Sequence, residues 1–396
     1  MLASTALLAF SAAAAVLATN LFVSDYSGNI TSLSLTAING TYALNQTHQT
    51  TECAPNPSWL TIDANRGLLF CLNEGLDTAN GSLSSFTINS DGSLTHIKNA
   101  TTISGPVNGV IYGSAAGQRA IALAHYTGSA VSSWLLQGGG KFAFNQNLPY
   151  TLAQPGPNPS RQEAPHEHEA ITDPTGQYIL VPDLGADLVR IFSYDDATLK
   201  LKTLSPLVAA PGSGPRHAAF WSPYGVACEG CTTYFYLVHE LASTVTGYAV
   251  DYLPNGGGLN FTVVYNSTTY DLLNLPEGNA PAEVHVSPDN RFLVISNRNN
   301  TSFTLPEPDG TLVPSDSLST FRLVDDGSLV FVQLWPSGGS YPRQFSFDST
   351  GGLIAVGNQY SQNVAILQRD VATGLIGEPI ARVLVPGNTT SVVFDE

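Results

Sequence analysis

The chain has 396 residues, of which 43% are hydrophobic and only 12% are charged, and its formal net charge is −16. An acidic protein of this kind repels nucleic acid and anionic membranes, and the chain contains no basic run that could bind either partner. The same charge favours a monomer. With 36 Gly, 25 Pro and a single Met, the composition is typical of strands and turns rather than helices.

The N-terminus has the pattern of an export signal. An apolar stretch over residues 7–17 ends in small residues, and Val16 and Ala18 suit the two positions that signal peptidase reads. We therefore expect residues 1–18 to be a signal peptide and residues 19–396 to form the mature, secreted protein. The alternative is a buried N-terminal helix. No other apolar run is long enough to span a membrane.

Ten Asn-X-Ser/Thr sequons agree with an extracellular protein, because such sites accept N-linked glycans. They lie at Asn29, Asn39, Asn45, Asn80, Asn99, Asn260, Asn266, Asn299, Asn300 and Asn388. We expect a secreted glycoprotein.

The four cysteines are Cys53, Cys71, Cys228 and Cys231. In an oxidising compartment they predict two short-range disulfides, Cys53–Cys71 and Cys228–Cys231. The Cys228-Glu-Gly-Cys231 motif could also be half of a zinc site or a redox dithiol. A zinc site needs two further ligands at suitable spacing, and a redox motif needs a βαβ context; the sequence offers neither. A disulfide is therefore the preferred interpretation.

One unit recurs along the chain: an apolar strand ending in Asp or Ser, a Gly-containing turn, a second apolar strand and a third strand of alternating pattern. It begins at Ser58, Val110, His168, Arg216, Ala282 and Arg343. The turn residues Asp63, Ser114, Asp173, Ser222, Ser287 and Asp348 recur about every 50 to 65 residues. This spacing is the blade length of a β-propeller, with four strands to a blade.

The two ends of the chain supply a seventh unit. The C-terminal TTSVVFDE matches the innermost strand of a unit, and the N-terminal LFVSDYSGNITSLSL matches the next two strands. Pairing them closes the ring and removes exposed sheet edges. We therefore predict an all-β fold in which residues 19–396 form a single seven-bladed β-propeller closed by its terminal strands. A stack of unrelated β-sandwiches is the competing interpretation.

In a propeller, the loop entering each innermost strand and the turn between the second and third strands open on the same face of the ring. Side chains at these positions converge on the central channel. The titratable side chains among them include His166, His168, Arg216, His217, Glu283 and Arg343 on the entering loops, and Asp183, Glu240 and Arg298 at the turns.

Three of the eleven arginines, Arg216, Arg298 and Arg343, are thus expected at one channel mouth. A planar guanidinium grips carboxylates and phosphates through paired hydrogen bonds, so the cluster predicts a site for an anion. The alternative is that each arginine pairs structurally with a carboxylate of a neighbouring blade.

His166, His168 and Glu240 are the candidates for acid–base chemistry, because histidine titrates near neutrality and glutamate can orient it. Either histidine could be the proton-transferring group. His166-x-His168 is not completed by further metal ligands, so we expect no metal. The chain also lacks a Gly-X-Ser-X-Gly elbow and a Gly-rich phosphate loop, which argues against a serine nucleophile and a nucleotide cofactor.

Several phrases around these residues resemble the seven-bladed lactonase family, which includes propeller-type 6-phosphogluconolactonases and fungal 3-carboxy-cis,cis-muconate lactonising enzymes. The resemblance covers most of the mature chain and is densest over residues 165–373. The phrases are APHEHEAITDPTGQYILVPDLGADLVRIFSYD, GSGPRHAAF, YLVHELASTVTGYAV, PAEVHVSPDNRFLVISNRN and YPRQFSFDSTGGLIAVGNQYSQNVAILQRD.

The resemblance implies that His168 is the catalytic histidine, that Arg216 and Arg298 grip the substrate and that Glu240 is their acidic partner. It leaves His166, Asp183, His217 and Arg343 as expected substrate-binding residues. Two stretches depart from the bare repeat, residues 221–234 with both later cysteines and residues 300–315.

We therefore expect hydrolysis of a sugar-derived lactone, of the aldono- or 6-phosphoglucono type, without a metal or other cofactor. The first alternative is a 3-carboxy-cis,cis-muconate cyclase, which runs lactone chemistry in the ring-forming direction. The second belongs to another class, a secreted glycoprotein propeller that binds a partner without turnover.

Overall fold

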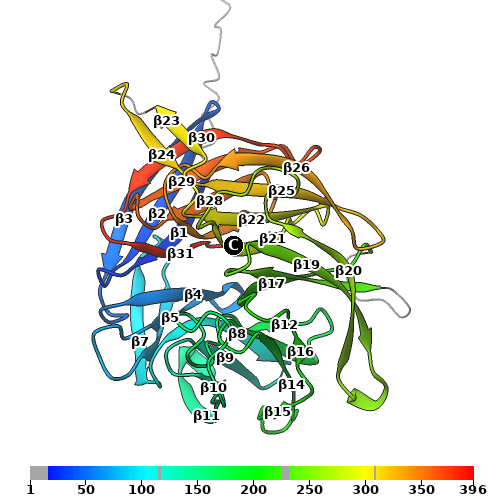
Figure 1. The fold of residues 1–396 in the computed structure, drawn as a ribbon. Helices are drawn as coiled ribbons and strands as arrows, with labels where there is room; N and C mark the ends of the chain where they lie inside the picture. The colour runs from blue at the N-terminus through cyan, green and yellow to red at the C-terminus, as the bar shows by residue number, and fades with distance from the viewer. Residues whose placement is uncertain (1–16, 115–116, 225–231, 307–308) are drawn as a thin grey trace, which may run out of the picture.

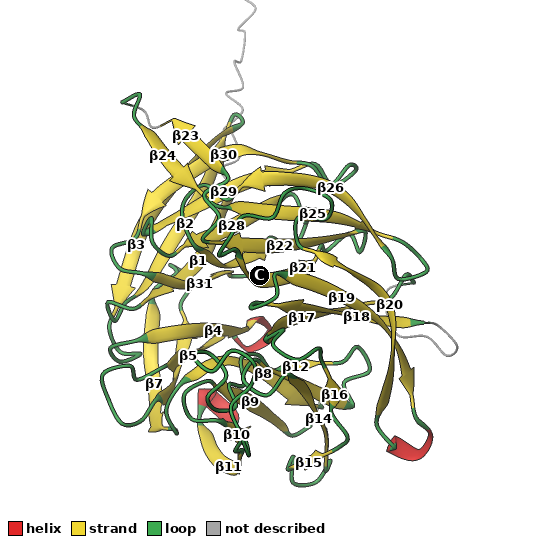
Figure 2. Cartoon of the chain, viewed as in Figure 1, coloured by secondary structure: helices red, strands yellow, loops and turns green. Residues whose placement is uncertain are grey.

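Each repeat of the sequence forms one antiparallel sheet whose principal strands follow one another from the centre of the molecule to its rim, as Figure 1 shows. The computed structural model describes residues 17–114, 117–224, 232–306 and 309–396. Within them the only helical turns are three short 3-10 segments, so the molecule is built almost entirely of strands (Figure 2). These segments are Ala64–Arg66, Gly138–Gly140 and Pro254–Gly256.

Six sheets are built from consecutive stretches of the chain. The first contains β4 (Pro57–Asp63), β5 (Leu68–Asn73), β6 (Ser82–Ile88) and β7 (Leu94–Thr101). The second contains β8 (Pro106–Gly113), β9 (Arg119–His125), β10 (Ala130–Leu136) and β11 (Phe142–Pro149). The third contains β12 (Ile171–Thr172), β13 (Tyr178–Asp183), β14 (Leu188–Tyr194), β15 (Leu201–Thr203) and β16 (Leu207–Val208).

The remaining three follow the same order. The fourth contains β17 (Pro215–Trp221), β18 (Thr233–His239), β19 (Thr244–Tyr252) and β20 (Leu259–Thr268). The fifth contains β21 (Ala280–Val286), β22 (Phe292–Arg298), β25 (Ser317–Leu323) and β26 (Leu329–Pro336). The sixth contains β27 (Pro342–Phe347), β28 (Leu353–Asn358), β29 (Asn363–Arg369) and β30 (Ile376–Leu384).

The seventh sheet is made by both ends of the chain. Its strand order is β3-β2-β1-β31, and β31 pairs with β1 in antiparallel register from Leu21 opposite Phe394 to Asp25 opposite Thr389. The predicted closure of a seven-bladed propeller by its terminal strands is therefore confirmed. The strands of this closing blade are β1 (Leu17–Asp25), β2 (Ile30–Ile38), β3 (Thr41–Thr50) and β31 (Thr389–Phe394).

Apolar side chains hold neighbouring blades together. Both faces of a blade's second strand pack against neighbouring sheets, so every residue of β5, β18 and β22 is buried. These strands are apolar for most of their length. Tyr236 of β18, for example, belongs to one cluster with Ile295 and Phe321 of the next blade. The core thus consists of layers between blades and leaves the centre of the ring to polar residues.

Five innermost strands have a proline as their first or second residue, and the regular pairing register shifts after it. Proline has no N–H to lose from the ladder, so it tolerates this break, and a β-bulge changes the direction of the side chains that follow. The residues that follow these prolines include Arg216, Glu283 and Arg343, which all take part in the site described below. The five prolines are Pro57, Pro106, Pro215, Pro281 and Pro342.

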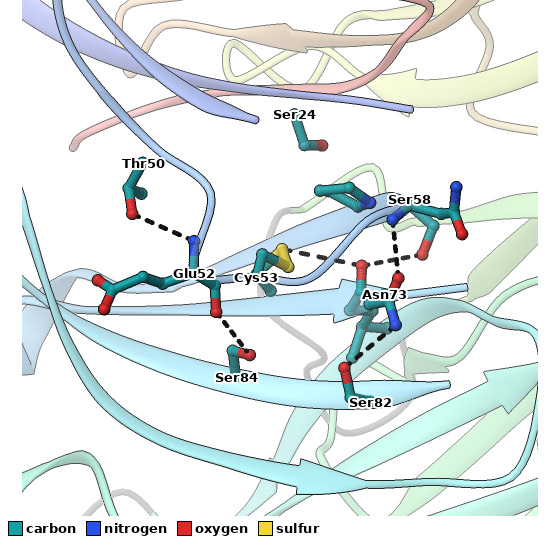
Figure 3. Close-up of a disulfide and its surroundings, with 12 residues drawn as sticks. Ser24, Thr50, Glu52, Cys53, Ser58, Asn73, Ser82 and Ser84 are labelled. Atoms are coloured by element: carbon teal, nitrogen blue, oxygen red, sulfur yellow. Dashed lines mark hydrogen bonds between the residues drawn. A yellow bond between two sulfur atoms is a disulfide. The ribbon is translucent and has the colours of Figure 1, made fainter. Parts of the chain in front are cut away.

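A disulfide joins the closing blade's outgoing loop to the next blade. Cys53 precedes β4, Cys71 lies in β5, and their Cα atoms are 6.0 Å apart, which confirms the first predicted pairing (Figure 3). The loop is held further at Glu52, whose amide donates to Thr50 Oγ1 and whose carbonyl accepts from Ser84 Oγ.

Several predictions lie wholly or partly outside the described residues. Cys228 and Cys231 belong to the stretch 225–231, and most of the predicted signal peptide belongs to residues 1–16. Strand β1 begins at Leu17, next to the predicted cleavage point. The long stretch after Arg298 forms a separate hairpin of β23 (Phe303–Pro306) and β24 (Leu312–Ser315), which lies beside β29 and β30 of the sixth blade (Figure 1). Within the described residues, no helical segment has the length and hydropathy needed to cross a membrane.

Candidate functional site

Glu240, the residue after β18, is the centre of a buried ion-pair cluster. Its Oε2 accepts a hydrogen bond from Arg216 Nε at 2.9 Å and lies 2.7 Å from Arg298 Nη2. Its Oε1 accepts a hydrogen bond from Arg161 Nη2 at 2.6 Å. The three arginines come from the loop before β12, from β17 and from the end of β22, so the ring fold alone brings them together.

The cluster fixes the charge of Glu240. Burial alone raises the pKa of its carboxyl, but the guanidiniums of Arg298, Arg216 and Arg161 outweigh burial and hold the pKa well below its usual value. Glu240 therefore stays ionised and is a very weak base.

Arg216 is 1% exposed, and burial, reinforced by the neighbouring guanidinium of Arg298, lowers its pKa to about 9. It remains a cation at neutral pH, because the buried carboxylate beside it compensates its charge.

His168 lies beside this cluster on the stretch that leads into β12. Its amide donates to the carbonyl of Pro182 at 2.9 Å, and its Nδ1 lies 3.1 Å from Nε2 of His217. Its Nε2 has no hydrogen-bonding partner in the part of the chain that the structure describes. Burial, aided by the charges of Arg216 and His217, lowers the pKa of His168 well below the usual value. The imidazole is thus neutral at physiological pH and has one nitrogen free.

Arg343 approaches the same mouth from β27. Its guanidinium lies over the ring of Tyr26 at 5.2 Å and reaches Glu74 only at 4.0 Å. The hydroxyl of Tyr26 donates to the same Glu74 carboxylate. Since Arg343 makes no short ion pair among the described residues, its charge is available to an anion.

The side chains of His166 and Asp183 make hydrogen bonds and ion pairs with protein groups. The ring of His166 lies within hydrogen-bonding distance of the carbonyl of Tyr126 at 2.8 Å and of Glu163 Oε1 at 3.0 Å. Asp183 is fully buried, accepts the amide of His166 and forms an ion pair with Arg190 at 2.5 Å. Both side chains hold the loop that carries His168 in place, and of the two candidate histidines only His168 keeps a free nitrogen.

His217 also contacts protein groups through both ring nitrogens. Its Nε2 meets His168, and its Nδ1 lies 2.9 Å from Glu283 Oε1. The ring packs edge-on against Trp59 at 5.8 Å. His217 thus links His168 to Glu283.

The sequence interpretation missed several groups of the site. Arg161 lies in a long loop outside the repeated phrase, and its partner Glu240 is 79 positions away. Glu283 lies directly after Pro281-Ala282, on a loop that the sequence places at the channel, but the sequence interpretation gave it no role. Tyr126 follows β9 and packs its ring against His168 at 5.6 Å.

Glu169, His217 and Glu283 form a buried group whose potential ligand atoms all lie within 4.8 Å of one another. Two carboxylates and one imidazole are a donor set that divalent cations accept. In the structure, however, His217 Nδ1 is within direct hydrogen-bonding distance of Glu283, and Glu169 Oε2 accepts the amide of Ala218 at 2.7 Å. A cation would have to displace these bonds. His-x-His spacing does not predict this set, because its members come from three blades.

The chain is similar to several proteins that are named as lactonases. A protein of Arthroderma benhamiae named "Probable 6-phosphogluconolactonase" is 28% identical over 359 residues, which cover 90% of this chain and 83% of the relative. The 6-phosphogluconolactonase of Bacillus subtilis is 28% identical over 335 residues, 84% of this chain and 85% of the relative.

Among solved structures, the periplasmic gluconolactonase of Pseudomonas aeruginosa is 25% identical and superposes with a TM-score of 0.76, covering 96% of this chain and 99% of that one. The model of the family described as "Lactonase, 7-bladed beta-propeller" matches residues 20–394. With its seven closed blades and this match over nearly its whole length, the chain belongs to the seven-bladed β-propeller lactonase family.

Proposed function

We propose that the protein hydrolyses a sugar-derived lactone with His168 as the general base and without a metal. The observation that carries the proposal is the neutral His168, with its Nε2 free, beside the guanidiniums of Arg216 and Arg298. A neutral imidazole accepts a proton from water, and fixed cations stabilise the charge that develops on a carbonyl oxygen.

In the proposed reaction, water attacks the carbonyl carbon of the lactone while His168 Nε2 takes one of its protons. The carbonyl electrons move onto the oxygen, and the arginine cluster stabilises this oxyanion. Collapse of the intermediate breaks the bond to the ring oxygen, which receives the proton from the His168 imidazolium. The products are an open-chain hydroxy acid and the neutral histidine.

Glu240 is assigned a supporting role. Since its pKa is held low by three guanidiniums, it cannot compete with His168 for the proton of water. It holds Arg216 and Arg298 in position and keeps their charges paired until substrate arrives.

Charge supports an anionic substrate. Arg161, Arg216, Arg298 and Arg343 carry four positive charges, and their carboxylate partners Glu240 and Glu74 carry two. An ionised Glu283, whose charge also acts on Arg216, reduces the surplus from two to one. A lactone with a phosphate or a second carboxylate uses this surplus. The printed names of the relatives, 6-phosphogluconolactonase and gluconolactonase, point to a sugar lactone as the substrate class.

The test is acid release in a pH-stat from glucono-δ-lactone and 6-phosphogluconolactone, with protein dialysed against a chelator. His168→Ala should lower the rate about 10² to 10⁴-fold. His48→Ala is the matched control, because His48 lies on the outer strand β3 with its side chain 40% exposed. Full activity of His168→Ala would refute the assignment of the base.

Two further outcomes separate the alternatives. Loss of activity on chelation and its return with a divalent ion would refute the metal-free reaction and direct attention to Glu169, His217 and Glu283. Absence of activity on every lactone, with conversion of 3-carboxy-cis,cis-muconate, would indicate the cyclase. Absence of both activities would leave the binding protein.

Export and glycosylation are part of the proposal. They are supported by the apolar N-terminus and by the ten sequon asparagines, none of which is buried in the structure. Expression of the full chain in a yeast host tests both features. We expect protein in the medium with its N-terminus at residue 19 and a mass that falls on enzymatic removal of N-glycans. Retention of residues 1–18 in the cell-associated protein would contradict export.

A further inference from the structure

We infer that Glu283, acting through His217, determines which ring nitrogen of His168 carries the proton. The three side chains form a continuous chain of contacts: Glu283 Oε1 lies 2.9 Å from His217 Nδ1, and His217 Nε2 lies 3.1 Å from His168 Nδ1. In this chain Glu283 and His217 are positioning residues. The inference rests on the proposed role of His168 as the base.

The direction of the hydrogen bonds follows from the carboxylate end. Glu283 Oε1 accepts the backbone amide of Val284 at 3.1 Å, so this oxygen already acts as an acceptor. With Glu283 ionised, its oxygens can only accept, so the nitrogen facing Oε1, His217 Nδ1, carries a hydrogen. A neutral imidazole has only one N–H, so His217 Nε2 is an acceptor.

The second imidazole is then determined by the first. Because His217 Nε2 accepts, the nitrogen 3.1 Å away, His168 Nδ1, must donate. The lone pair of His168 is thereby placed on Nε2, the nitrogen that has no hydrogen-bonding partner among the described residues. This tautomer is the one that general-base catalysis requires.

The chain lies in a buried environment, in which a hydrogen bond orients its partners strongly. Glu283 and His217 are each 1% exposed and His168 is 7% exposed. The other titratable groups that face the chain are Glu169, 3.9 Å from His217 Nδ1, and His285, 3.7 Å from Glu283 Oε1. The guanidinium of Arg216 also acts on both histidines.

The state of the two acids is consistent with this direction. Burial, together with the charge of Glu283, raises the pKa of Glu169 well above its usual value, so Glu169 holds a proton. Burial also raises the pKa of Glu283, but His285 and Arg216 oppose this shift. Because the pKa of Glu169 is raised further than that of Glu283, we take Glu283 as the ionised member of the pair. Burial lowers the pKa of His217, so this ring remains neutral.

The chain also has a consequence for catalysis. When His168 accepts a proton on Nε2 it becomes an imidazolium whose Nδ1–H still points to His217. The negative charge of Glu283 then stabilises the imidazolium through the intervening ring.

Nitrogen-15 NMR of the histidine side chains tests the inference directly, because the nitrogen shifts report the tautomer, and His168→Ala assigns the His168 signals. We expect the wild-type protein to show His168 protonated on Nδ1 and unprotonated on Nε2. A His168 protonated on Nε2 would overturn the inference. The measurement needs no substrate, so it remains decisive even if every lactone fails and the proposed function falls.

Glu283→Gln supplies the second test. An amide N–H₂ can donate to His217 Nδ1, which reverses both hydrogen bonds and moves the His168 proton to Nε2. If the wild-type protein is an active lactonase, we expect Glu283→Gln to lower kcat at least about 10²-fold while KM changes little. The wrong tautomer removes the base without removing the binding site. An unchanged kcat with an unchanged His168 tautomer would overturn the inference.

Glu167→Gln is the matched control. Glu167 is a fully buried carboxylate adjacent to His168 in the chain, and it forms an ion pair with Arg190 at 2.8 Å instead of with a histidine. Its substitution should lower stability without changing the His168 tautomer. If Glu167→Gln changed the His168 tautomer as Glu283→Gln does, the effect would not be specific to Glu283. That outcome would overturn the assignment to Glu283.

Discussion

The protonation state of His168 depends on its burial and on the charges of the neighbouring side chains. A buried imidazole close to guanidiniums resists protonation, because the imidazolium would lose hydration and meet like charges. The same guanidiniums are acceptable in the interior only because Glu240 pairs with them. At the scale of single residues, the site therefore couples a neutral base to a compensated cluster of cations.

This coupling predicts the pH dependence of the reaction. Only neutral His168 can act as the base, and its pKa lies well below the ordinary histidine value of about 6.5. The rate constant kcat/KM should therefore stay level as pH falls through 6.5 and decrease only at lower pH. Initial rates from roughly pH 4 to pH 7, corrected for spontaneous hydrolysis, measure this. An acid limb centred at or above 6.5 would contradict the proposed state of His168.

We expect Glu240→Gln to lower the free energy of unfolding. The substitution leaves Arg216 and Arg298 buried without their carboxylate, and breaking a buried ion pair in this way costs about 3 to 5 kcal/mol. Denaturant unfolding should show a loss of this size in the free energy of unfolding. Glu378→Gln, on an exposed position of β30, is the control and should be neutral. A loss below about 1 kcal/mol for Glu240→Gln would refute its role as the anchor of the cluster.

At the scale of elements, the bulged start of the innermost strand is the feature that directs side chains to the channel. In a regular strand, adjacent residues point to opposite faces. The register shift after Pro215 relaxes this constraint, so Arg216 and His217 both reach the site from neighbouring positions of β17. The shift after Pro281 presents Glu283 in the same way.

The disulfide of the β3–β4 loop makes a second prediction at this scale. It closes a loop of 18 residues, and in the chain-entropy model such a link stabilises a protein by about 3 kcal/mol. A protein with both Cys53→Ser and Cys71→Ser should unfold at lower denaturant by this free energy, and lactonase activity of the folded variant should persist. An unchanged midpoint would show that packing alone holds the loop to β5.

For the whole molecule, closure of the ring determines stability. β31 pairs with β1 on one side and contacts β4 and β27 on its faces, so it joins three blades. Removal of residues 388–396 should expose the edge of β1 and abolish cooperative thermal unfolding, with aggregation visible by size-exclusion chromatography. A control lacking only Asp395 and Glu396 keeps β31 and should unfold as the full chain does. Cooperative unfolding of the shorter chain would contradict closure as the source of stability.

The sequence by itself determined the blades, their closure, the Cys53–Cys71 disulfide and the family resemblance. Strand periodicity, turn residues and the prolines near the start of the inner strands are local patterns. Because they repeat along the chain, they can be recognised from the sequence alone. The same repetition placed Arg216, Arg298, Arg343, Glu240 and His168 at one face of the ring.

Only the tertiary structure decided how these residues act on one another. Arg161 reaches Glu240 from a loop outside the repeat, and Asp183 and His166 make hydrogen bonds that hold the loop carrying His168. The charge of Glu240 and the orientation of His168 depend on contacts across blades that are distant in the chain. Such contacts follow from the curvature of the ring and the bulges of its inner strands, and no local pattern of residues encodes them.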